Sequence, residues 1–103
     1  MKPFCISVAA EKDLKQIWRY TAQHYGILQA DLYTNVLLLG CQKIAQQPLV
    51  FLSLRLANQD FRVYRYKNHY ILYLVADDKV VIVAFFHERM DIMVRLRARL
   101  ENS

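Results

Sequence analysis

The chain has 103 residues, 55% of them hydrophobic and 22% charged, which excludes disorder of the whole chain and fits one domain over residues 1–103. Its net charge of +5 favours an acidic partner, either nucleic acid or an acidic protein segment. Its apolar runs fall far short of the roughly 18 residues that span a bilayer, so we expect a cytoplasmic protein that does not enter a membrane.

The first half of the sequence predicts a short strand and two helices. Phe4–Val8 is rich in residues that favour strands. From Ala9 the apolar residues recur at helical spacing as far as Gly26, which tolerates positive φ and so ends the helix. A second helix is predicted over Leu28–Gln47, before Pro48. Because the turn between the two helices is so short, we expect an antiparallel helical hairpin.

The second helix carries apolar residues on two stripes. The stripes are Leu28, Leu32, Val36 and Leu39, and Tyr33, Leu37, Cys41 and Ile44. A single core hides only one of them, so we expect an exposed apolar patch that a partner covers. A disordered acidic tail suits this patch, and a two-fold homodimer is the alternative. The candidate residues for binding this partner are Leu32, Val36, Leu39, Phe51 and Leu54.

The second half of the sequence predicts an antiparallel sheet. The segment 49–58 is apolar without a clear period and receives no element. Strands are predicted over Phe61–Tyr66, His69–Ala76 and Val80–His87, joined by short polar turns. The last strand is apolar on both faces and is therefore expected inside the sheet. A final helix begins after Asp91, its N-cap, and leaves its arginines in water.

These elements define an α+β fold in the order β-α-α-β-β-β-α, with a helical hairpin packed on an antiparallel sheet. Cys5 and Cys41 are expected to be buried and unpaired, since neither belongs to a metal-binding or redox motif. His87 and Asp91 are four residues apart, but a strand-to-helix junction separates them, so no metal site is expected. No glycine-rich phosphate loop is present, and no cofactor is expected.

An ordered set of motifs resembles a known family. The motif residues are Ala10, Asp13, Leu14, Ile17 and Tyr20; Gly26, Gln29, Ala30 and Tyr33; Ala45 and Pro48; Arg62, Tyr64, His69, Ile71 and Tyr73; and His87, Arg89, Met90 and Asp91. Together they resemble the ParE branch of the RelE/ParE toxin superfamily of bacterial type II toxin–antitoxin modules, over about Lys2 to Asp91.

The resemblance implies a cytoplasmic toxin that acts in plasmid stabilisation and poisons DNA gyrase by protein binding, without catalytic residues. It also implies a ParD-like antitoxin whose C-terminal part wraps the toxin and whose N-terminal part binds operator DNA. No direct sequence-specific binding of nucleic acid is then expected of the toxin alone. The candidate target-binding residues are His87, Arg89, Met90 and Asp91, polar or mobile elements at the end of a rigid sheet.

Ribosome-dependent mRNA cleavage of the RelE type, on the same fold, is the alternative activity. Such a nuclease needs cations to stabilise the charged phosphorane and an acid and base for proton transfer. Arg62 and Arg65 are the candidate cations, and His87 or Glu88 the acid or base. The simpler interpretation of Arg62 is an ion pair with Asp60 or Glu88. A third possibility is a small basic interaction domain that only resembles the toxins.

Overall fold

The computed structural model describes residues 3–101. The elements in chain order are β1 (Phe4–Ile6), α1 (Val8–Tyr25), α2 (Ile27–Gln46), β2 (Leu52–Leu56), β3 (Gln59–Tyr66), β4 (His69–Val75), β5 (Val80–His87) and α3 (Ile92–Glu101). The α+β class and the helical hairpin are confirmed. The structure adds one strand, β2, in the segment to which the sequence assigned no element.

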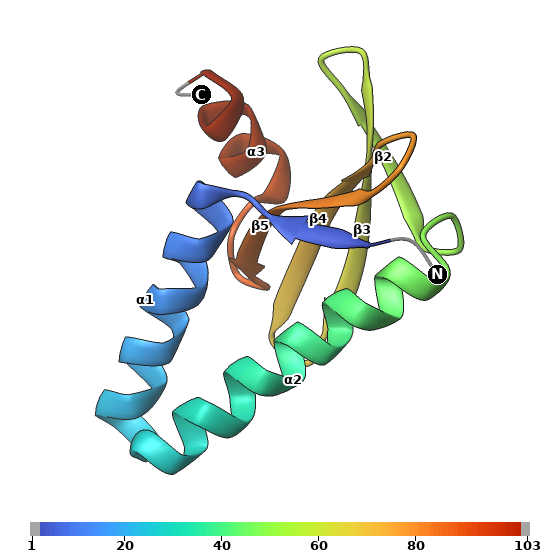
Figure 1. The fold of residues 1–103 in the computed structure, drawn as a ribbon. Coiled ribbons are helices and arrows are strands. Elements are labelled where there is room, and N and C mark those ends of the chain that lie inside the picture. The colour runs from blue at the N-terminus through green and yellow to red at the C-terminus, as the bar shows by residue number, and fades with distance from the viewer. Residues whose placement is uncertain (1–2, 102–103) are drawn as a thin grey trace.

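The strands form one sheet in the order β1-β5-β4-β3-β2 (Figure 1). β1 pairs in parallel with β5, and all other neighbouring strands are antiparallel. The expected interior position of the strand at 80–87 is confirmed, because β5 lies between β1 and β4. The α1–α2 hairpin packs on one face of the sheet and α3 on the other, so each face has its own apolar core.

The added strand β2 forms a hairpin with β3. Leu54 and Leu56 pack against the core on the α3 face of the sheet. The two turn residues, Ala57 and Asn58, have positive φ angles of 53° and 62°. A two-residue hairpin turn with two positive φ angles is usually built on Asn-Gly or Asp-Gly. The missing glycine explains why the sequence did not indicate this hairpin.

The two cysteines differ in burial. Cys41 is buried, as predicted, but the prediction is wrong for Cys5, which is exposed. β1 is a three-residue strand at the edge of the sheet. Phe4 and Ile6 pack against the core. Because side chains alternate along a strand, Cys5 between them faces away from that core.

Two contacts fix α2 against the sheet. A Cβ atom on Gly40 would lie 3.0 Å from Cδ1 of Ile71, so the absence of a side chain lets the helix approach β4 closely. The hydroxyl of buried Tyr73 donates to the carbonyl of Pro48 at 2.7 Å, just beyond the end of α2. Both contacts involve the C-terminal part of α2 or the residues just after it.

Candidate functional site

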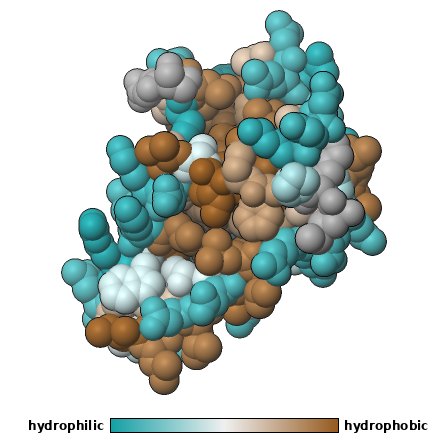
Figure 2. Space-filling model, in the orientation of Figure 1, coloured by the Kyte–Doolittle hydropathy of each residue, from teal (hydrophilic) through white to brown (hydrophobic). Residues whose placement is uncertain are grey.

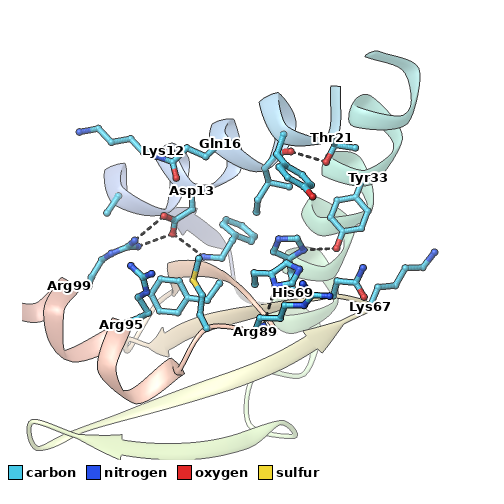
Figure 3. Close-up of a pocket in the computed structure, with 18 of the residues that line it drawn as sticks. Lys12, Asp13, Gln16, Thr21, Tyr33, Lys67, His69, Arg89, Arg95 and Arg99 are labelled. Atoms are coloured by element: carbon cyan, nitrogen blue, oxygen red, sulfur yellow. Dashed lines mark hydrogen bonds and ion pairs between the residues drawn. The ribbon is translucent and has the colours of Figure 1, made fainter. Parts of the chain in front are cut away.

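A cleft of about 1610 Å³ opens between α1, α3 and the C-terminal end of β5 (Figure 3). α1 forms one wall, α3 and the segment before it form another, and Tyr33 of α2 and the β3–β4 turn close the far end. The four predicted target-binding residues, His87, Arg89, Met90 and Asp91, all line this cleft. The structure thus brings these four residues to one concave surface.

β5 has a bulge beside the cleft. The pairing with β4 passes from Ile82 to Ala84 and skips Val83. The Val83 carbonyl accepts hydrogen bonds from Oγ of Ser7 at 3.3 Å and from Arg99 at 2.9 Å. Such a bulge bends a strand and redirects the residues that follow it. Here those residues lead into the cleft.

An ion pair closes the cleft at the bulge. The Arg99 guanidinium donates to both carboxylate oxygens of Asp13 at 2.8 Å, and the Phe85 N–H donates to the same carboxylate at 3.0 Å (Figure 3). The side chains of Asp13 and Arg99 are only 14% and 22% exposed. The pair therefore connects α1, β5 and α3 at one point. It also corrects the expectation that the arginines of the last helix lie in water, in the case of Arg99.

A tyrosine and two histidines form the opposite end of the cleft. The Tyr33 hydroxyl lies 2.6 Å from Nδ1 of His69 (Figure 3). The rings of His69 and His87 meet edge to face, with their centroids 5.2 Å apart. Burial, followed by the neighbouring His87, lowers the pKa of His69 to about 4, while Glu88 acts in the opposite direction. His69 is therefore neutral at pH 7, and its Nδ1 can accept the tyrosine proton in a hydrogen bond.

The segment between β5 and α3 is held by its own turn. The Arg89 N–H donates to Nδ1 of His87 at 3.1 Å. The Asp91 carboxylate accepts from the N–H groups of Met93 and Val94, so the predicted N-cap is confirmed. These bonds hold the backbone of Arg89 and leave its side chain exposed at the cleft.

The two cations proposed for the nuclease alternative do not come together. Arg62 lies on the α2 face of the sheet, where its guanidinium donates to the carbonyls of Leu49 and Phe51 at 3.1 and 2.8 Å. Arg65 lies on the α3 face, where it pairs with Glu88 at 2.6 Å. Side chains alternate between the two faces along a strand, so residues 62 and 65 of β3 point to opposite faces. The two cations therefore cannot hold one phosphate. The predicted ion pair of Arg62 with Asp60 is present at 3.6 Å.

The candidate antitoxin-binding residues are brought together only in part. Leu32 and Leu39 are 54% and 59% exposed on the outer face of α2, with Val36 half-buried beside them. Phe51 packs against the core between the sheet and the α1–α2 helical hairpin, whereas Leu54 lies on the face of the sheet that α3 covers. The expected exposed stripe on the second helix is confirmed. Figure 2 shows further apolar surface at the end of the molecule where α1 meets α2.

Besides His87, the side chains that form the two ends of the cleft were not predicted as site residues. They are Asp13, Tyr33, His69 and Arg99. Asp13, Tyr33 and His69 do belong to the motifs that carried the resemblance, so their presence there was the available signal. Arg99 lies beyond those motifs, and no spacing in the sequence indicates that it reaches a residue 86 positions away.

Within residues 3–101, no helix is long and apolar enough to cross a membrane. In the same part of the chain, no three His, Cys, Asp or Glu side chains gather closely enough to hold a metal ion.

The chain belongs to the ParE toxin family of the type II toxin–antitoxin system parDE, because the model of that family matches residues 5–92. It is 33% identical to a toxin ParE of Escherichia coli over 102 residues, covering 98% of this chain and 99% of that protein. It is 29% identical to toxin ParE1 of Caulobacter vibrioides over 96 residues, covering 93% of this chain and 99% of that protein.

Two solved structures share the fold. One is a chromosomal ParDE system from P. aeruginosa, with a TM-score of 0.74 and 12% identity over 84% of this chain and 96% of that one. The other is the RelBE2 toxin–antitoxin complex of Mycobacterium tuberculosis, with a TM-score of 0.62 and 19% identity over the same shares. At these identities the likeness extends to the fold alone.

Proposed function

We propose that this ParE-family toxin poisons DNA gyrase by binding to it, without chemistry of its own. The family match over residues 5–92 is the observation that carries the proposal. The cleft supports it, because the four candidate target-binding residues lie together there on a rigid sheet end. A surface held by a strand, a bulge and an ion pair is preorganised for protein binding.

The positions of the two arginines favour gyrase binding over RelE-type mRNA cleavage. The Arg62 guanidinium donates hydrogen bonds to backbone carbonyls on one side of the sheet. Arg65 pairs with a carboxylate on the other side. A nuclease requires its cations around one phosphorane. The separation of the two predicted cations therefore supports protein binding as the activity.

The test combines two assays on the purified toxin. We expect a stoichiometric amount to inhibit supercoiling by gyrase and to increase the amount of cleaved, gyrase-bound DNA. A ribosome programmed with mRNA should yield no site-specific cuts. Unchanged supercoiling together with such cuts would overturn the proposal in favour of the nuclease.

The antitoxin is the second part of the proposal. We propose that an acidic, ParD-like antitoxin lays an amphipathic segment on the exposed stripe of α2 that contains Leu32 and Leu39. The stripe is apolar and the chain carries a net charge of +5, so both surface and charge suit such a partner. Co-expression with an acidic, ParD-like protein encoded beside this chain should give a complex that withstands moderate salt. Failure of the two proteins to co-purify would contradict it.

A further inference from the structure

The cleft holds most of the net positive charge of the chain. Five cationic side chains line it against two carboxylates, which leaves a net charge of +3 there out of +5 in the whole sequence. The cations are Lys12, Lys67, Arg89, Arg95 and Arg99, and the carboxylates are Asp13 and Asp91. A concave surface with one dominant sign of charge attracts a partner of the opposite sign.

Neither carboxylate is available to neutralise the other cations. Asp13 is bound to Arg99 and to the backbone of β5, and Asp91 caps α3. Among the described residues, Lys12, Arg89 and Arg95 have no carboxylate within 4 Å. In Figure 3, Lys12 and Lys67 extend outward at opposite ends of the cleft, and Arg95 points toward α1.

Part of the surface between these cations is apolar. Ile17, Met90 and Ala98 line the cleft together with the buried rings of Phe85 and Phe86. Met90 is 37% exposed, so an apolar side chain entering the cleft can cover it. A nucleic-acid backbone would contact the cations but leave this apolar surface in water, whereas a peptide can meet both.

We propose that the cleft binds a segment of the target protein that carries carboxylates around an apolar anchor residue. This inference rests on the proposed function and names the chemistry of the partner at that site. The target, rather than the antitoxin, is the occupant because the exposed stripe of α2 is a separate apolar surface. The two surfaces belong to different faces of the hairpin, since Leu32 and Leu39 are absent from the lining of the cleft.

Two matched pairs of cations test the proposal. Lys12 and Arg95 line the cleft, whereas Lys15 and Arg97, exposed on the same two helices, do not. We expect Lys12→Glu combined with Arg95→Glu to weaken binding to purified gyrase at least tenfold, through loss of charge complementarity. Lys15→Glu combined with Arg97→Glu makes the same change in net charge and should weaken it less than twofold. Equal losses in both double variants would overturn the proposal.

A photo-cross-linking residue in place of Met90 identifies the occupant. With the complex of gyrase and DNA, we expect an adduct on a protein segment rich in Asp and Glu around an apolar residue. An adduct on DNA would assign the cleft to nucleic acid, and an adduct formed only with the antitoxin would assign it to that partner. Either result overturns the inference. If the wild-type toxin itself does not bind gyrase, the proposed function fails, which the binding measurement shows before any variant is compared.

Discussion

Asp13 and Arg99 lie 86 positions apart in the sequence, yet the guanidinium of one meets both carboxylate oxygens of the other at 2.8 Å. The same two side chains bond to the backbone around the bulge in β5, through the Phe85 N–H and the Val83 carbonyl. One contact thus connects both helical walls of the cleft to the strand between them. The shape of the cleft depends on this connection.

Replacing Arg99 with Met should therefore destabilise the protein more than a surface change does. Arg99→Met keeps aliphatic packing over the Phe86 ring. It removes the cation that pairs with the Asp13 carboxylate, whose side chain is only 14% exposed to water. We expect the free energy of unfolding in urea to fall by about 2 kcal/mol. A double-mutant cycle with Asp13→Asn should show coupling of about 1 kcal/mol or more. Strictly additive losses would mean that the ion pair contributes nothing.

Stability should decrease in mild acid because of His69. Its pKa of about 4 in the folded protein lies below the ordinary value of 6.5, so the unfolded chain binds the proton more readily. The contribution is fully present above pH 6.5 and is lost as the pH falls toward 4. Urea midpoints between pH 7 and pH 4 should show this loss in the wild type and less of it in His69→Gln. The control is His24→Gln, which replaces an exposed histidine and leaves His69 and its contacts in place, so the loss of stability due to His69 should remain.

The fold was predicted well where a periodic pattern of apolar residues was accompanied by residues that begin or end a helix. Gly26 ends α1, and Asp91 caps α3, as expected. β2 was missed because its turn at Ala57 and Asn58 has left-handed residues without glycine. Cys5 was wrongly predicted to be buried. It belongs to a three-residue edge strand with only one face against the core, and a run of apolar residues does not indicate which of them lie on that face.

The candidate site was predicted only along one stretch of chain. His87 and the three residues of the 89–91 segment are neighbours in sequence, so one motif contained them all. Asp13, Tyr33 and Arg99 come from three helices and reach the cleft only after the hairpin and α3 have packed on opposite faces of the sheet. A single sequence does not contain the distances between such elements.

Arg62 and Arg65 should differ in their effect on stability. Arg62 is 18% exposed and holds the Leu49 and Phe51 carbonyls, whereas Arg65 is 59% exposed in a surface ion pair. We expect Arg62→Ala to lower the free energy of unfolding by about 1–2 kcal/mol, because it leaves two carbonyls without their donor. Arg65→Ala should cost less than about 0.5 kcal/mol. Matching urea midpoints for the two variants would contradict this structural role for Arg62.

Arg89 should affect target poisoning without affecting stability. Its side chain is exposed at the cleft, and the bond that fixes the turn comes from its backbone N–H. Arg89→Ala should therefore keep the thermal midpoint of the wild type and lower the inhibition of gyrase at least tenfold. Arg97→Ala, outside the cleft on α3, is the matched control and should inhibit like the wild type. Full inhibition by Arg89→Ala would remove this residue from the target-binding site.

The exposed stripe of α2 should govern self-association and antitoxin binding. Leu32 and Leu39 are more than half exposed, so Leu32→Glu combined with Leu39→Glu should change the free energy of unfolding by less than about 1 kcal/mol. The free toxin should self-associate less at high concentration, because charge replaces an apolar patch. Affinity for the antitoxin should fall at least tenfold, measured by titration calorimetry. Leu52→Glu, at a position 72% exposed on β2, is the control for an unrelated apolar site and should leave the affinity unchanged. If the α2 double variant binds the antitoxin as tightly as the wild type does, the antitoxin lies elsewhere on the toxin.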